Sequence, residues 1–181
     1  MSCKCFEKKI VFKSTDAFNI RLNASKCKCS SRFTVHEKRS CFSILCKDCK
    51  LVDKYKIDGY FDSDKSHKKC DYLFIYYDNN NKNNRTIIFV ELKGKDIEHA
   101  IKQLDATIST FDKEHFFSGK DEKGLIGAVV STGYPTDDAT FRKLKKNLID
   151  KFKKYNIQVE RKTYHMRYDP KKNKCLGVNE K

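Results

Sequence analysis

Hydrophobic and polar positions alternate along several short segments in the middle of this chain. Three of these segments have the pattern of β-strands: Lys54–Phe61, Cys70–Tyr77 and Thr86–Lys93. The sequence Asp62-Ser63-Asp64 predicts a turn, and the polar run Asp78–Arg85 predicts a turn or loop. Three sequential strands with short connections predict an antiparallel meander.

The period changes after Gly94, where apolar residues recur at the spacing of an α-helix. Asp96 can cap this helix, which we expect to end near Asp112. Its apolar stripe comprises Ile97, Ala100, Ile101, Leu104, Ile108 and Phe111. The segment Gly124–Ser131 is nearly continuous in apolar residues, which is typical of a strand buried on both faces.

A second helix and a final strand follow. Thr136 can cap the helix. The buried face of this helix would comprise Phe141, Leu144, Leu148, Ile149 and Phe152. Ile157–Arg161 predicts a strand, and Tyr164–Tyr168 is a candidate continuation of it. The tail from Pro170 is polar and is expected to fray.

The first third of the chain has little periodicity. Lys9–Lys13 and Phe18–Leu22 are short strand candidates. Residues 23–53 are rich in cysteine and aperiodic, apart from a weak strand pattern at Arg32–Val35. We therefore expect an N-terminal cysteine-rich region (1–53), a core (54–169) and a polar tail (170–181).

The composition indicates the kind of partner. The 181 residues are enough for one domain with a real core, and the formal net charge is +15. Such a charge favours a polyanionic partner, because lysines that neutralise phosphates release counterions. The alternative is a Lys- and Asn-rich chain whose lysines are simply solvated. The apolar stretches are too short for a membrane span and the N-terminus lacks a signal region, so we expect a cytoplasmic protein without a membrane partner.

Nine cysteines are many for a chain of this expected location, and an odd number argues against a disulfide framework. Cys27 and Cys29 are separated from Cys46 and Cys49 by residues 30–45, an interval close to that of a zinc ribbon. These four thiols are therefore candidate ligands of a structural Zn²⁺. The alternative is reduced cysteines packed as small hydrophobic side chains. No Cys–His pair stands out as a catalytic nucleophile with its base.

The strongest chemical signal lies on the second and third predicted core strands. Side chains alternate along a strand, so Glu91 and Lys93 point to one face and Leu92 to the other. If Asp71, which opens the preceding strand, points to the same face, two carboxylates and a lysine converge. This set suffices for Mg²⁺-assisted hydrolysis of a phosphodiester.

The arrangement resembles the PD-(D/E)xK nuclease superfamily over roughly residues 54–163, with Asp71, Glu91 and Lys93 at the motif positions and Cys70 in place of the proline. The resemblance implies an α/β (α+β) restriction-endonuclease-like core. Such a core has a central mixed β-sheet, an antiparallel meander plus a parallel strand, flanked by helices. The order of predicted elements agrees with it.

The resemblance also implies roles for individual residues. Asp71 and Glu91 would bind Mg²⁺ or Mn²⁺, and the carbonyl of Leu92 could add a ligand. Lys93 would stabilise the charge that develops during cleavage. Gln103 is a candidate for contact with the metal-bound water or the substrate phosphate. Further weaker candidates are Asp58, as a ligand or a turn residue beside Gly59, and Glu37 and His99.

The sequence thus predicts a Mg²⁺-dependent nuclease; it favours DNA as the substrate and leaves the choice between DNA and RNA open. Two alternatives stay open: a nucleic-acid-binding protein without activity, and an interaction protein on the same fold. The sequence leaves the oligomeric state open, a homodimer included.

Overall fold

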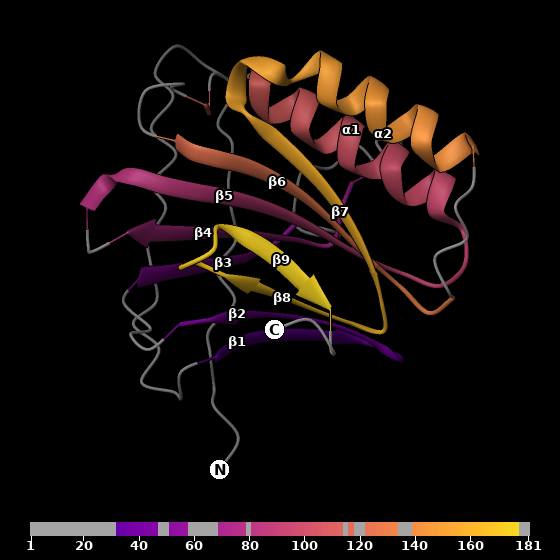
Figure 1. The fold of residues 1–181 in the computed structure, drawn as a ribbon, viewed down its shortest axis with the longest axis horizontal. Helices are drawn as coiled ribbons and strands as arrows, with labels where there is room; N and C mark the ends of the chain where they lie inside the picture. The colour runs from indigo at the N-terminus through magenta and orange to yellow at the C-terminus, as the bar shows by residue number, and fades with distance from the viewer. Residues whose placement is uncertain are drawn as a thin grey trace.

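A computed structural model describes residues 32–46, 51–57, 69–78, 81–113, 116–117, 122–133 and 139–177. Within these ranges the fold is mixed α/β, with two mixed sheets and two α-helices. The elements form three layers, in which the helices cover one face of the larger sheet and the smaller sheet covers the other (Figure 1). None of the described helices is long and apolar enough to cross a membrane.

The larger sheet contains the predicted meander. Its strands in spatial order are β3 (Val52–Lys56), β4 (Tyr72–Asp78), β5 (Asn81–Lys93), β6 (Glu122–Ser131) and β7 (Ile157–Thr163). β3, β4 and β5 are antiparallel neighbours, while β5, β6 and β7 are parallel. The parallel strands are joined by helices, as parallel connections require.

The two helices are α1 (Ile97–Lys113), between β5 and β6, and α2 (Ala139–Lys151), between β6 and β7. Asp96 caps α1 as predicted, because its Oδ1 accepts a hydrogen bond of 2.9 Å from the amide of His99. All six residues of the predicted stripe of α1 are buried. α2 is followed by a short 3₁₀ turn, η2 (Lys153–Tyr155). The predicted cap of α2, Thr136, lies outside the described residues.

The predicted buried face of α2 is only partly buried. Leu148 and Phe152 are buried, whereas Phe141, Leu144 and Ile149 are half-buried and pack against the same core. α2 therefore lies at the margin of the helical layer.

The smaller sheet was largely unexpected. Its order is β1 (Arg32–Glu37), β2 (Ser40–Leu45), β8 (His165–Asp169) and β9 (Lys174–Gly177). β1 corresponds to the weak strand pattern in the cysteine-rich region, but β2 was not predicted. The expectation of a frayed tail was wrong for β9, because Cys175 is buried in the core between the sheets and Leu176 is buried as well. A strand of four residues is too short to reveal its period in the sequence.

The chain changes sheets at Tyr164, so β8 is not a continuation of β7 as expected. Tyr164 has a left-handed backbone, with φ 58°. Its amide donates to the carbonyl of Ser131 at the end of β6, and its carbonyl accepts from the amide of Cys41 in β2, both at 2.7 Å. This single residue therefore ties the two sheets together.

Two other predicted boundaries were wrong. β5 begins at Asn81, although residues 78–85 were expected as a turn or loop, because Tyr77 pairs with Arg85 and Asp78 with Asn81 across a register shift. The first core strand runs from Val52 to Lys56 rather than over 54–61, and residues 58–61 lie outside the described ranges. The strand candidates 9–13 and 18–22 lie outside them as well.

Alternation along β5 connects the two cores. Ile87 and Phe89 pack with the helices, while Ile88 and Val90 pack toward the smaller sheet. The same parity places Glu91 and Lys93 on the helical side. Glu91 and Lys93 thus lie on the helix-facing side of β5, just past the part of the strand that packs in the apolar core.

Candidate active site

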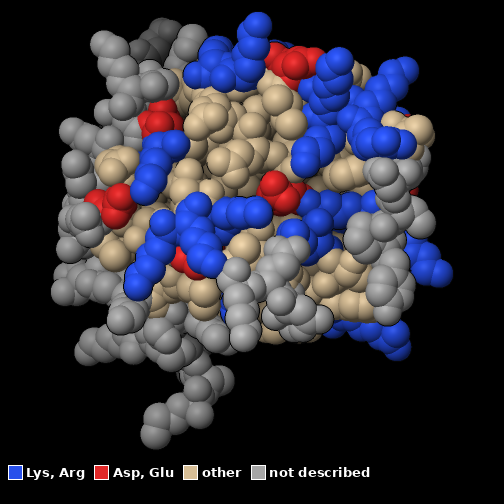
Figure 2. All heavy atoms as spheres, in the orientation of Figure 1, with Lys and Arg blue, Asp and Glu red and all other residues tan. Residues whose placement is uncertain are grey.

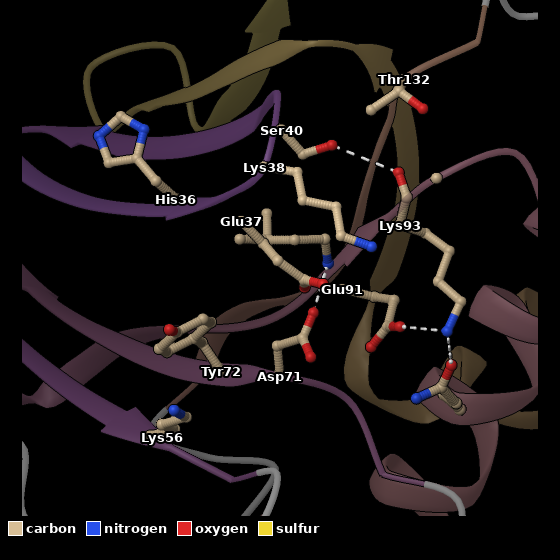
Figure 3. A pocket seen from close by; sticks show the side chains of 13 residues that line it. His36, Glu37, Lys38, Ser40, Lys56, Asp71, Tyr72, Glu91, Lys93 and Thr132 are labelled. Carbon is tan, nitrogen blue, oxygen red and sulfur yellow. Dashed lines mark hydrogen bonds and ion pairs between the residues drawn. The ribbon is translucent and has the colours of Figure 1, made fainter.

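A pocket of about 520 Å³ lies where β4 begins and its antiparallel neighbour β5 ends. Asp71, Glu91, Leu92, Lys93 and Gln103 line it together with residues of the β1–β2 hairpin. In Figure 3, the Lys93 ammonium lies on one side of the Glu91 carboxylate, and Asp71 and Glu37 lie on its other side. The structure therefore brings together the residues that the motif singled out.

The strand register explains the position of Asp71. Tyr72 is paired with Val90, so the next residues outward on the two strands are Asp71 and Glu91. The Oδ2 atom of Asp71 accepts a hydrogen bond of 2.7 Å from the amide of Leu92. This contact holds the Asp71 carboxylate at the end of β5, while the side chain of Leu92 is buried in the core between the sheets.

Glu91 is the most unusual group in the pocket, because its side chain is only 1% exposed. Its Oε1 lies 3.5 Å from Nζ of Lys93. Its Oε2 is buried and has no hydrogen-bond partner among the residues that the structure describes. Burial, and then the nearby charge of Asp71, raise the pKa of Glu91 to about 9, although Lys93 opposes the shift. Keeping this buried carboxyl group ionised costs free energy unless a cation accompanies it.

Lys93 and Gln103 form a short chain of hydrogen bonds. Nζ of Lys93 donates to Oε1 of Gln103 at 2.8 Å, and Nε2 of Gln103 donates to the carbonyl of Lys69 at 2.7 Å. The two contacts orient the Gln103 amide, which in turn holds the Lys93 ammonium beside Glu91. Gln103 thus contacts the catalytic candidate Lys93, a relationship that the sequence did not reveal.

Cys70, which occupies the position of the motif's proline, has a structural role here. Its amide donates a hydrogen bond of 2.8 Å to Oγ1 of Thr107, and that hydroxyl donates to the carbonyl of Gln103 at 2.8 Å. A proline could not make the first bond, because it has no N–H. Burial raises the pKa of the Cys70 thiol well above its ordinary value, so the thiol stays neutral. Cys70 and Thr107 therefore fasten the start of β4 to α1.

The β1–β2 hairpin contributes residues that the sequence analysis missed. His36, Lys38 and Ser40 line the pocket, as does Glu37, which the sequence suggested only weakly. Ser40 is 2% exposed, and its hydroxyl donates to the carbonyl of Lys93 at 3.3 Å. Lys56, Tyr72, Gly94 and Thr132 complete the lining. The local sequence pattern could not predict that the hairpin lines the pocket, because the hairpin belongs to the smaller sheet.

The hairpin also contains a Cys–His contact that the sequence analysis did not anticipate. Sγ of Cys41 lies 4.0 Å from Nε2 of His36. Burial raises the pKa of Cys41, which favours the thiol over the nucleophilic thiolate. The contact therefore gives no support to cysteine catalysis.

The other candidates from the sequence are not found in the described lining of the pocket. Asp58 and three of the four zinc candidates, Cys27, Cys29 and Cys49, fall outside the described residues. Cys46 is buried in the core between the sheets. The zinc site stays a prediction, as do the ligand roles of Asp58 and of the Leu92 carbonyl. His99 is half-buried on α1 and is not among the residues that line the pocket.

The donor set of the pocket fits a hard divalent cation held by few protein ligands. In the described part of the chain, no three His, Cys, Asp or Glu side chains are grouped so as to hold a metal ion. Mg²⁺ does not need such a cage, because it commonly binds through one or two carboxylates and keeps several waters. Asp71 and the orphaned Oε2 of Glu91 are suited to that mode. Comparison of the chain with protein-family models, curated proteins and solved structures found no match.

Proposed function

We propose that this protein is a Mg²⁺-dependent nuclease that hydrolyses phosphodiester bonds, in DNA rather than RNA, on a restriction-endonuclease-like core. One observation carries the proposal: the Oε2 atom of Glu91 is buried, without a hydrogen-bond partner among the described residues, in a pocket that it shares with Asp71 and Lys93. A carboxylate so placed is unfavourable in the free protein and becomes favourable once a cation occupies the pocket.

The residues of the pocket would have different roles in the reaction. Asp71 and Glu91 would hold the cation, which supplies charge neutralisation at the scissile phosphate and makes water a better nucleophile at neutral pH. Lys93 would stabilise negative charge that develops on the phosphate, since its ammonium reaches the pocket beside Glu91. Gln103 would keep that ammonium in place through its 2.8 Å hydrogen bond.

The charge of the chain supports a polyanionic substrate. The formal net charge is +15, and Figure 2 shows Lys and Arg side chains spread widely over the visible face. Electrostatic attraction of this kind favours any nucleic acid and carries no sequence information. The charge therefore supports a nucleic-acid substrate, and a cleavage assay must decide between DNA and RNA.

A nucleic-acid-binding protein without activity is the competing proposal. It accounts for the positive charge equally well. It does not account for Glu91, because a buried carboxyl group whose Oε2 has no hydrogen-bond partner among the described residues destabilises the fold. The nuclease proposal gives this residue a use.

The deciding experiment is a cleavage assay on supercoiled plasmid, single-stranded DNA and RNA, with Mg²⁺, Mn²⁺, Ca²⁺ or EDTA. We expect cleavage of DNA with Mg²⁺ or Mn²⁺ and none with EDTA. The Glu91→Gln variant, purified in parallel, should be inactive and so exclude a contaminating nuclease. Binding of nucleic acid without cleavage under every condition would favour the competing proposal.

A further inference from the structure

We propose that the β1–β2 hairpin is a phosphate-binding element of this pocket, and that Lys38 at its tip contacts a substrate phosphate that flanks the scissile one. The inference rests on the proposed function for the identity of the substrate. It extends that function by naming a residue from the smaller sheet that would hold the substrate over the carboxylates.

The first argument comes from the interactions that the lysines of the pocket make. Among the residues that the structure describes, three lysines line the pocket: Lys38, Lys56 and Lys93. Lys93 is held by Glu91 and Gln103, and Lys56 also has an interaction partner. Lys38 makes no hydrogen bond or ion pair with any described residue, and it is exposed. Of the three, Lys38 therefore has the ammonium that is available to a ligand.

The backbone of Lys38 gives a second, independent argument. Its φ of 51° lies in the left-handed region, which is unfavourable for a residue with a side chain of this size. Such conformations persist where the surrounding structure enforces them, often at ligand-binding sites. Asparagine or glycine would adopt this turn more readily. A lysine at this position therefore indicates a use for its side chain.

The direction of the side chain gives a third argument. In Figure 3 the Lys38 side chain extends from the hairpin into the pocket, and its ammonium lies above the Glu91 carboxylate, apart from the Lys93 ammonium. A phosphate strand that passes over Asp71 and Glu91 would therefore meet a second cation in addition to Lys93. A lysine ammonium is a compact point charge that suits a phosphate oxygen without demanding one orientation.

The hairpin is anchored firmly enough to position such a contact. The buried hydroxyl of Ser40 donates to the carbonyl of Lys93, which is part of the motif itself. The amide of Cys41 donates to the carbonyl of Tyr164 at 2.7 Å, and the amide of Tyr164 donates to Ser131 at the end of β6. The tip of the hairpin is thus fixed to the ends of β5 and β6, where the site lies.

The charges of the pocket support such a contact. The carboxylates Glu37, Asp71 and Glu91 all line the pocket. Carboxylates repel an approaching phosphate. A cation on the hairpin side would offset this repulsion for the part of the substrate that lies beyond the metal site.

The test compares variants of the two residues at the hairpin tip. Lys38→Asn removes the charge and tolerates the left-handed backbone, Lys38→Arg keeps the charge, and Arg39→Asn is the matched control. Arg39 is equally exposed in the same turn but does not line the pocket. Dissociation constants for an oligonucleotide would be measured in Ca²⁺ over a range of salt concentrations, and KM and kcat would be measured in Mg²⁺.

We expect Lys38→Asn to raise the dissociation constant and KM by roughly 10-fold and to lower the salt slope by about 0.7–0.9, the value for one phosphate contact. kcat should change little, and Lys38→Arg should retain most of the affinity. Equal effects of Lys38→Asn and Arg39→Asn would overturn the proposal, as would a large loss of kcat with unchanged KM. Lys38→Gly, which also suits the backbone, checks that the effect follows the charge.

The binding arm separates this inference from the proposed function. If the parent protein binds the oligonucleotide through Lys38 but never cleaves it, the nuclease proposal fails and the hairpin contact stands. If the parent cleaves but Lys38→Asn binds like the control, the hairpin inference alone fails. If the parent neither binds nor cleaves, both fail.

Discussion

The amide of Leu92 donates a hydrogen bond of 2.7 Å to the carboxylate of Asp71, so the central residue of the Glu91-Leu92-Lys93 tripeptide holds the acidic side chain of the neighbouring strand. The side chain of Leu92 points away from the site. Here its backbone fixes the geometry of the site while its side chain anchors the strand in the core.

Two substitutions of Asp71 separate this structural role from a role in metal binding. Asp71→Asn retains an oxygen that can accept the Leu92 hydrogen bond, so its unfolding free energy should stay close to that of the parent. Asp71→Ala leaves the amide without its partner and should destabilise the protein by about 1–3 kcal/mol. Chemical denaturation measures both. Both variants should lose Mg²⁺ affinity, and an Asp71→Asn variant that still cleaves DNA would contradict the assigned role.

Lys93→Ala should lower kcat by about 10²–10³-fold, because the ammonium stabilises charge in the transition state rather than ligating the metal. Its divalent-metal affinity and most of its DNA affinity should remain, whereas Glu91→Ala should lose both metal affinity and cleavage. Calorimetry and cleavage kinetics measure the two properties. The control is Lys123→Ala, an exposed lysine at the far end of β6. Cleavage by Lys93→Ala at the parental rate would show that the motif is wrongly assigned.

The stability of the metal-free protein should depend on Glu91. Its carboxyl has an ordinary pKa of 4.5 when the chain is unfolded and a pKa of about 9 in the folded protein. The folded state therefore binds a proton that the unfolded state releases between these values, and stability falls as pH rises from 4.5 to 9. Glu91→Gln removes this dependence, so in EDTA at pH 8 its melting temperature should exceed that of the parent.

Mg²⁺ provides the converse measurement. The cation should raise the melting temperature of the parent at pH 8, because it binds the folded state and stabilises the ionised form of Glu91. It should have little effect on Glu91→Gln. A parent protein that Mg²⁺ and Mn²⁺ fail to stabilise would speak against a metal site in this pocket.

Gln103→Met should lower kcat by roughly 10- to 100-fold, the usual range for a partner that orients a functional group. The methionine has a similar length but can neither accept from Lys93 nor donate to the carbonyl of Lys69. KM and DNA affinity should stay near the parental values, because the substitution acts through Lys93. Lys102→Ala, an exposed neighbour on the same helix, is the control. A change in KM alone would indicate direct substrate contact instead.

Cys70→Pro would introduce the proline of the motif but should destabilise this protein by about 1–3 kcal/mol. The substitution removes the amide that donates to Thr107, and the Thr107 hydroxyl is buried. Cys70→Ala keeps that amide and serves as the control for loss of the thiol. If the proline variant is as stable as the alanine variant in denaturant titration, the Cys70–Thr107 bond contributes nothing measurable.

Local periodicity was enough to predict much of the larger sheet and the helix α1 that packs on it. The apolar stripe of α1 and the continuous apolar run of β6 have long and clear periods, so their types and approximate limits were predictable. Strand parity alone placed Glu91 and Lys93 on one face. These features are local, because they follow from the repeat of a helix or a strand and from burial of one of its faces.

The second sheet and the hairpin wall of the pocket follow from tertiary packing. β2 and β9 are short, and neither has a pattern that reveals it. β2 pairs with β8, more than a hundred residues away, and Cys175 of β9 is buried in the core between the sheets. The contacts Ser40–Lys93 and Lys93–Gln103 likewise join residues from different elements. The positions of Lys38 and Gln103 around the motif therefore depend on how whole layers pack, which no local period encodes.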